Sequence, residues 1–179
     1  MEYVALLRGI NVGGKTLKME PLVELFEAMK LANVRTYIQS GNVLFTAAAS
    51  GAGKLKAELE SRIAKRFGLA VTVILRTRRE LKRVLDSNPL LQSGSRDSER
   101  MHVTFLEDEP AAAAPGASPA AGNPQDEFSL AGKEVYVYCP GGYGKTVFSN
   151  SYFEKALQVK ATTRNWRTVT KLCELMGEQ

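Results

Sequence analysis

The sequence contains few of the residues that build metal centres and hydrolytic active sites. Two cysteines, one histidine and one tryptophan occur among its 179 residues. Cys139 and Cys173 lie outside any C-x-x-C pair, which argues against a zinc site or a redox framework. His102 lies in an apolar run typical of a strand, so we expect a packed histidine rather than a general base. The sequence therefore predicts no metal site, no cofactor and no identifiable catalytic residue.

Long apolar runs are also absent. No stretch approaches the ~20 residues of a membrane helix, and no basic-then-apolar leader opens the chain, so we expect a cytoplasmic protein without a membrane partner. Hydrophobic residues make up 44% of the chain, enough for a core. The formal net charge is +5, although residues 107–134 contain one Lys against six Asp and Glu. A basic body with one acidic insert suits an anionic partner, and solubility alone could also explain it.

The loop after the first apolar run fits a phosphate-binding pattern. Residues 9–16 read Gly-Ile-Asn-Val-Gly-Gly-Lys-Thr and meet the G-x-x-x-x-G-K-[ST] spacing of a P-loop. A working P-loop runs straight into a helix whose N-terminus faces the phosphate. Pro21 favours a later helix start, because proline suits the first helical position and disrupts the second turn. We therefore prefer an anion-binding loop of another type, and a true P-loop or a plain solvated loop are the alternatives.

Residues 1–76 predict an order of strand, helix, strand, strand, helix, strand. The strands are expected at 3–7, on both sides of a turn at Ser40-Gly41 within 34–47, and at 70–75; the helices are expected from Pro21 and over 54–67. A single bulged strand over 34–47 is the alternative to the hairpin. The order is typical of a ferredoxin-like split βαβ subdomain with an antiparallel sheet and both helices on one face. A P-loop kinase would instead alternate strands and helices around a parallel sheet.

Residues 77–179 predict a second, smaller α/β subdomain packed on the first, so the expected fold class is α+β. Capping boxes at Thr77-x-x-Glu80 and Ser151-x-x-Glu154 each predict the start of a helix. Further elements are a strand at 101–106, a hairpin over 128–138 with its turn at Ala131-Gly132, and a last helix from Thr162 or Thr163 to about Met176. Residues 107–126, rich in Ala, Pro and Gly, predict a mobile loop.

Three stretches resemble one bacterial family. They are Leu6-Leu7-Arg8-Gly9-Ile10-Asn11-Val12-Gly13-Gly14-Lys15, Thr36-Tyr37-Ile38-Gln39-Ser40-Gly41-Asn42-Val43 and Ala161-Thr162-Thr163-Arg164-Asn165-Trp166-Arg167-Thr168-Val169-Thr170-Lys171-Leu172. In them the chain is similar to the domain-of-unknown-function family numbered sixteen ninety-seven. The resemblance spans nearly the whole chain and implies an α+β fold with a ferredoxin-like part. It implies no activity, because the family has none assigned. Residues 111–125 depart from the family, whose pattern there suggests a helix, by carrying Pro115, Pro119 and Pro124.

The small, polar and cationic residues of these stretches suggest a shared anion-binding cleft. The paired glycines of the first loop can form an N–H nest, and the last helix would offer free N–H groups at Thr162 and Thr163. Arg164 and Lys171, spaced i, i+7, would share one face of that helix. The candidate ligand-binding residues are Arg8, Asn11, Gly13, Gly14, Lys15, Gln39, Ser40, Asn42, Lys145, Thr163, Arg164, Asn165 and Lys171.

Three functions remain open from the sequence. The preferred one is a binding module for a phosphorylated small molecule or for nucleic acid, and the sequence favours binding over catalysis without deciding between them. The alternatives are a small P-loop-like kinase using Lys15, Thr16 and Asp108, and a structural or protein-interaction domain that takes no ligand.

Overall fold

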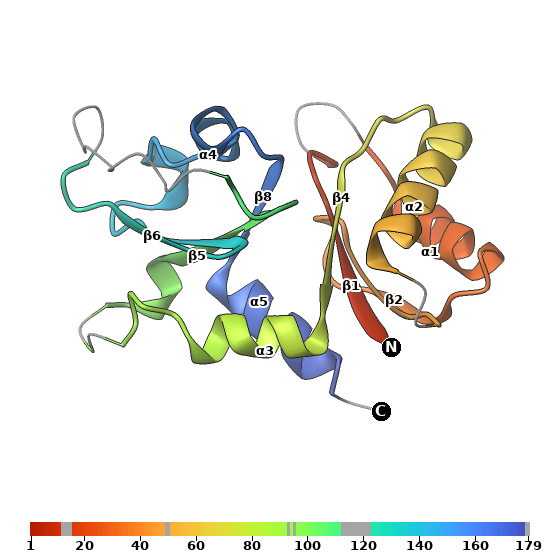
Figure 1. Ribbon diagram of the computed structural model, residues 1–179, viewed down its shortest axis with the longest axis horizontal. Coiled ribbons are helices and arrows are strands. Elements are labelled where there is room, and N and C mark those ends of the chain that lie inside the picture. The colour runs from red at the N-terminus through yellow and green to blue at the C-terminus, as the bar shows by residue number, and fades with distance from the viewer. Residues whose placement is uncertain (12–15, 49–50, 93, 95, 112–122, 178–179) are drawn as a thin grey trace. The chain divides into compact units, whose positions relative to one another are not determined.

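The chain forms two compact units, and each is described by itself. The computed structural model describes residues 1–11, 16–48, 51–92, 94, 96–111 and 123–177. Unit 1 comprises residues 1–81 and 172–179, and unit 2 comprises residues 82–171. Each unit contains one four-stranded antiparallel sheet with helices, which confirms the predicted α+β class (Figure 1).

Unit 1 is built on a sheet with the strand order β2-β3-β1-β4, in which all neighbouring pairs are antiparallel. Its elements are β1 (Glu2–Leu7), α1 (Met19–Ala28), β2 (Ala32–Thr36), β3 (Asn42–Thr46), α2 (Ala52–Phe67) and β4 (Val73–Thr77). Helices α1 and α2 lie on the same face of the sheet (Figure 1), where Phe26, Leu59 and Ile63 are buried against Phe45. This sheet is not the parallel one expected of a P-loop kinase.

The boundaries of unit 1 follow local signals with small shifts. Helix α1 begins at Met19, so Pro21 lies in the first turn, where N–H groups have no intrahelical partner and a missing one costs little. Helix α2 ends at Gly68, whose φ of +66° is the left-handed stop that glycine provides. Strand β4 spans Val73–Thr77 rather than 70–75, because its pairing with β1 runs from Leu7–Val73 to Tyr3–Thr77.

Unit 2 has the strand order β6-β7-β5-β8, again with antiparallel pairs throughout. Its elements are β5 (Met101–Leu106), β6 (Glu127–Ala131), β7 (Glu134–Tyr138), α4 (Asn150–Leu157) and β8 (Ala161–Asn165), with short 3-10 turns at Ser98–Arg100 and Tyr143–Lys145. The predicted hairpin with its turn at Ala131-Gly132 is confirmed, and Gly132 has a φ of +60°. The expected mobility of residues 107–126 falls largely on residues outside the described ranges.

Helices α3 (Arg78–Asp86) and α5 (Trp166–Leu175) follow β4 and β8 directly. The division between the units falls inside both helices: residues 82–86 belong to unit 2 and residues 172–175 to unit 1. Unit 1 is therefore discontinuous in sequence. Among the described residues, no helix is long and apolar enough to cross a membrane.

The two sheets repeat one plan down to the register of single residues. Val4 lies opposite Leu44 and Arg76 in unit 1, as Val103 lies opposite Tyr136 and Arg164 in unit 2. The two arginines are equivalent also in environment, because both are buried and each donates Nη1 to the preceding carbonyl at 2.9 Å. The N–H groups after β1 and β5 match too: Arg8 donates to Thr72 and Glu107 to Lys160, each at 2.9 Å.

The last helix begins at Trp166, so the prediction that it starts at Thr162 or Thr163 is wrong. Residues 161–165 form β8 and pair with β5 along their whole length. Two adjacent β-branched threonines suit a paired strand better than a helix. The Oδ1 of Asn165 instead accepts a hydrogen bond from the Thr168 N–H at 2.8 Å, the bond of a helix N-cap.

Helix α4 also starts earlier than predicted, at Asn150. Its N-cap is Ser149, whose Oγ accepts from the Tyr152 N–H at 3.3 Å. The predicted capping box at Ser151 is therefore wrong, because Glu154 accepts from the Ala161 N–H at 2.9 Å and so fixes the start of β8. The box at Thr77 is confirmed: the Glu80 carboxylate accepts from the Thr77 N–H at 2.7 Å.

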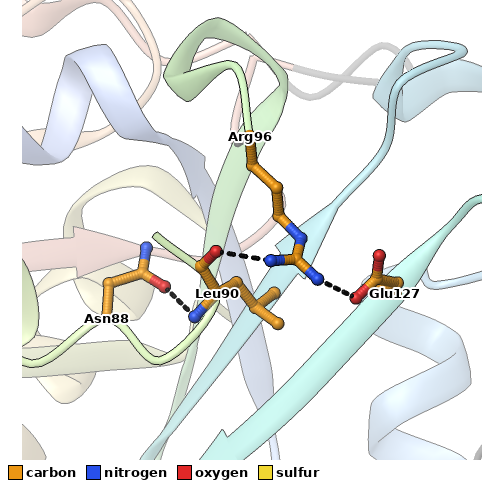
Figure 2. Close-up of polar contacts among 4 residues, drawn as sticks. All are labelled: Asn88, Leu90, Arg96 and Glu127. Carbon is orange, nitrogen blue, oxygen red and sulfur yellow. Dashed lines mark hydrogen bonds and ion pairs between the residues drawn. The ribbon is translucent and has the colours of Figure 1, made fainter. Parts of the chain in front are cut away.

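Arg96 fastens the connection between α3 and β5 to the edge strand β6 (Figure 2). Its Nη2 lies 2.6 Å from Glu127 Oε2, and its Nη1 donates to the Leu90 carbonyl at 2.9 Å. The Leu90 N–H in turn donates to Asn88 Oδ1 at 3.0 Å, and the guanidinium lies 5.9 Å from the ring centre of Tyr138. One cation thus links this connection to the edge of the sheet.

Candidate functional site

Two of the resembling stretches meet in unit 1 at the end of β1. Asn11 Nδ2 donates to the carbonyls of Leu17 at 3.1 Å and Gln39 at 2.6 Å, while its Oδ1 accepts from the Leu17 N–H at 2.8 Å. Asn11 has a φ of +56°, a conformation that asparagine tolerates. One side chain therefore ties both ends of the 11–17 loop to the β2–β3 turn. We call residues 8–11, 17 and 37–41 the loop–turn junction.

The turn is held from inside by two further residues. Asn42 is fully buried, and its Nδ2 donates to the Tyr37 carbonyl at 3.1 Å and to Ser40 Oγ at 2.8 Å. A Cβ at Gly41, whose φ is +73°, would lie 2.6 Å from the Ile10 side chain. Asn42 thus supports the turn, and only glycine allows the two stretches to approach this closely.

Ile38, in this turn, has an unusual backbone conformation for an isoleucine. It is 51% exposed and holds a φ of +51°. A β-branched residue in the left-handed region is strained, and about half of the Ile38 side chain lies in solvent. Among the other predicted residues here, Gln39 is exposed and Arg8 and Ser40 are partly buried, whereas Gly13, Gly14 and Lys15 lie outside the described residues.

The predicted cationic face of the last helix does not include Arg164. That residue is on β8 and only 8% exposed, with Nη1 donating to Thr162 Oγ1 at 2.8 Å and to the Thr163 carbonyl at 2.9 Å. Burial lowers its pKa to about 10. Lys171 is on α5, and Lys145 is exposed at the end of a 3-10 turn. A cleft shared by these residues and the loop–turn junction stays a prediction, because the two groups belong to different units.

Thr163 is the centre of a polar cluster in unit 2. Its Oγ1 donates to Asn150 Oδ1 at 2.6 Å, accepts from Tyr143 Oη at 3.0 Å and lies 2.7 Å from Thr104 Oγ1. A threonine hydroxyl has one donor and two acceptor positions, so all are used. The Tyr143 ring stacks on His102 with 4.5 Å between ring centres. We call His102, Thr104, Tyr143, Asn150 and Thr163 the Thr163 cluster.

Burial shifts the pKa of each titratable group in and beside this cluster toward the neutral form. Burial lowers the pKa of His102, with an opposing effect from the Arg100 backbone. Burial raises the pKa of Tyr143, which the hydrogen bond to Thr163 partly opposes, and raises that of Cys139 to about 11. In each case burial therefore favours the uncharged form of the imidazole, the phenol and the thiol. Within the described part of the chain, no group of three or more His, Cys, Asp or Glu could hold a metal ion.

A separate groove of about 580 Å³ lies beside the end of α4. It is lined by Glu107, Asp108, Glu109, Ala111, Glu154, Leu157, Gln158, Val159 and Lys160. Glu154 is already bonded to the Ala161 N–H, and Asp108 lies 3.7 Å from Lys133 Nζ. An excess of carboxylates repels anions, so this groove does not suit the predicted ligand class.

The sequence singled out two members of the Thr163 cluster: Thr163 itself as a candidate ligand-binding residue, and His102 as a packed histidine. His102 was expected to be packed, and it does stack on Tyr143; its neighbours Thr104, Tyr143 and Asn150 were missed. The available signal was the alternation in β5, where His102 and Thr104 put two polar residues on one face of an apolar strand. Tyr143 and Asn150 carry no comparable signal, because only the folded chain brings them to that face.

Comparison with known proteins identifies a family and shows a similar solved structure. The family model described as "Protein of unknown function (DUF1697)" matches residues 1–136. The structure of the conserved bacterial protein SP0830 from Streptococcus pneumoniae is similar, with a TM-score of 0.73 and 21% identity over 99% of this chain and 98% of that chain. At this identity the likeness shows the fold alone. No curated protein matches the chain.

Proposed function

The chain belongs to this family of unknown function, and we propose that it binds a small phosphate-bearing anion at the loop–turn junction of unit 1. The observation that carries the proposal is the triple hydrogen bonding of Asn11. It joins two stretches distant in sequence into one polar rim without using the exposed Gln39 side chain. A rim ordered before binding loses less conformational entropy when a ligand arrives.

The charge of Arg8 and the backbone strain at Ile38 support an anion site at the same loop–turn junction. Arg8 directly follows β1, and an arginine presents a planar fork of donors that matches phosphate oxygens. The net charge of +5 favours anions in general. The strained, exposed Ile38 borders the rim, and backbone strain concentrates at functional sites.

The finer structural and cellular expectations belong to this proposal as well. The element order of unit 1 and its β2-β3-β1-β4 sheet support a ferredoxin-like subdomain. A cytoplasmic location remains the expectation from the sequence. Nucleic acid is the second source of phosphate that the site could meet, and a protein-interaction domain without a ligand is the outcome if no anion binds.

Thermal unfolding in phosphate tests the proposal. At matched ionic strength, phosphate should raise the melting temperature saturably relative to chloride, because a ligand that binds only the native state stabilises it. Arg8→Ala should remove most of that shift. Arg62→Ala is the matched control, since Arg62 lies on α2 of the same unit, with 56% of its side chain exposed. Absence of a wild-type shift, or a full shift in Arg8→Ala, would contradict the proposal.

A labelled single-stranded oligonucleotide separates the two sources of phosphate. If nucleic acid is the ligand, fluorescence anisotropy should show affinity that falls with salt, with a log–log slope set by the number of phosphates neutralised. Arg8→Ala should then reduce that slope by about one unit. Phosphate stabilisation without measurable oligonucleotide binding would identify a small phosphorylated molecule.

A further inference from the structure

Unit 1 serves as an internal reference for the Thr163 cluster, because the two sheets share one register. Tyr3 pairs with Phe45 and Thr77, as His102 pairs with Val137 and Asn165. The shared register makes three positions of unit 1 equivalent to three of unit 2: Tyr3 to His102, Ala5 to Thr104, and Leu75 to Thr163.

The shared plan does not need polar residues at these positions. In unit 1, Tyr3 and Ala5 are buried in the hydrophobic core and Leu75 packs against it. Unit 2 has an imidazole and two hydroxyls at the same positions. Burying polar groups costs free energy unless each is bonded, so the imidazole and the two hydroxyls need partners that the apolar residues of unit 1 do not need. The sheet plan that the two units share therefore does not by itself require these polar residues.

A second difference between the two units also involves the Thr163 cluster. In unit 1 residues 47–51 connect β3 to α2, whereas in unit 2 the longer segment 139–149 connects β7 to α4. The added length contains the 3-10 turn at Tyr143–Lys145, and Tyr143 both stacks on His102 and donates to Thr163. Asn150, the first residue of α4, completes the group. A changed sheet face and an added loop thus converge on one partly buried polar cluster.

The chemistry of the cluster limits its ligand. None of the five side chains is an acid or a permanent cation, so the cluster provides no counter-charge for a phosphate or an ammonium group. It offers a phenol ring, an imidazole and a carboxamide, which is the set that stacks on nucleobases and hydrogen-bonds their edges. We propose that the Thr163 cluster of unit 2 binds the uncharged base of a nucleoside. The site differs in unit and in ligand chemistry from the anion site proposed above.

The single histidine makes the test direct. In a ¹H–¹³C spectrum of the full chain, the one imidazole Cε1–Hε1 signal reports on the cluster. Uridine, cytidine, adenosine and guanosine are titrated separately, with glucose and inorganic phosphate as comparison ligands. At least one nucleoside should move the signal saturably, while glucose and phosphate should not. No response to any nucleoside, or a response to glucose or phosphate equal to that of the best nucleoside, overturns the proposal.

Two variants connect the signal to the cluster. Tyr143→Phe keeps the ring and removes the hydroxyl that donates to Thr163. Because this bond helps to hold the cluster together, the best nucleoside should bind roughly fivefold to tenfold more weakly. Tyr152→Phe is the matched control: Tyr152 lies in the same unit with its ring against Phe148 and Phe153, outside the cluster, and its variant should bind as the wild type does. Wild-type affinity in Tyr143→Phe overturns the proposal.

Thr163→Leu introduces the residue that unit 1 has at the equivalent position. The nucleoside response should be lost, because the hydroxyl that joins Thr104, Tyr143 and Asn150 is gone. A folded Thr163→Leu with unchanged affinity also overturns the proposal. Should this variant fail to fold, Tyr143→Phe, which keeps the aromatic ring, decides the question.

Discussion

Ile38 is exposed and holds a left-handed backbone conformation. That conformation costs a non-glycine residue roughly 1–2 kcal/mol, whereas glycine adopts it freely but loses about 0.5–1 kcal/mol of chain entropy on folding. Ile38→Gly should therefore raise the free energy of unfolding in urea by up to about 1 kcal/mol. Ile38→Val, which keeps the strain, should leave it unchanged. A clear loss of stability in Ile38→Gly would show that the isoleucine side chain contributes packing in spite of its exposure.

The burial of His102 predicts how the free energy of unfolding depends on pH. Because burial lowers its pKa below 6.5, the unfolded chain takes up a proton at a higher pH than the folded chain does. The contribution of the neutral His102 imidazole to the free energy of unfolding is complete above pH 6.5. It falls as the pH drops from 6.5 toward the folded-state pKa. An NMR titration of the imidazole should place its pKa below 6.5, and His102→Phe should flatten stability against pH in that window. An imidazole pKa above 6.5 would contradict the prediction.

At the scale of elements, α3 and α5 start with equivalent caps made from different residues. Thr77 and Glu80 form a reciprocal box, with the Glu80 carboxylate 2.7 Å from both the N–H and the hydroxyl of Thr77. Asn165 caps α5 with one bond to the Thr168 N–H. Each helix follows its strand without a loop, so the cap residue ends the strand and begins the helix.

Removing these caps should destabilise the chain in a graded way. Thr77→Ala should cost about 1–2 kcal/mol and Asn165→Ala about 1 kcal/mol in urea unfolding followed by circular dichroism. Thr170→Ala is the control: the Thr170 hydroxyl donates to the Trp166 carbonyl at 3.0 Å inside α5, a bond that does not stabilise helices, so the effect should stay within about 0.5 kcal/mol. If Thr170→Ala lowered the free energy of unfolding as much as Thr77→Ala, the cap hydrogen bonds would contribute no more to stability than a bond inside the helix.

At the scale of the whole molecule, the chain end completes the first unit. Residues 172–179 belong to unit 1, where Leu172 and Met176 are each 1% exposed and the Leu175 carbonyl accepts a hydrogen bond from Arg35. Unit 1 therefore becomes complete only when the last helix has formed. Its folding depends on residues separated by almost the full length of the chain.

Truncation after Lys171 tests this dependence. Losing two buried apolar side chains costs about 2–5 kcal/mol each, so amide hydrogen exchange should show lost protection in β2 and β3 of unit 1. Truncation after Met176, which removes only the residues from Gly177 onward, should leave the protection of those strands near that of the full chain. Equal protection in both truncated chains would refute the assignment of residues 172–176 to unit 1.

The sequence by itself determined the elements whose signals are local. The apolar stripe and Gly68 stop of α2, the box at Thr77, the strand at 101–106 and both hairpin turns act within a few residues and agree with the structure. The antiparallel sheet of unit 1 followed from the order of these elements. The resemblance to a family of unknown function was likewise contained in three short stretches.

Tertiary structure alone decided the role of residues 161–165. The stretch Thr162-Thr163-Arg164 is compatible with a helix start, and only pairing with β5 makes it a strand and buries Arg164. The Thr163 cluster has the same origin, since Thr104 and Thr163 are 59 positions apart and meet only by cross-strand register. Helix caps and turns form between neighbouring residues, whereas a buried cation or a polar cluster requires closing long loops, and no local pattern encodes which distant segments will meet.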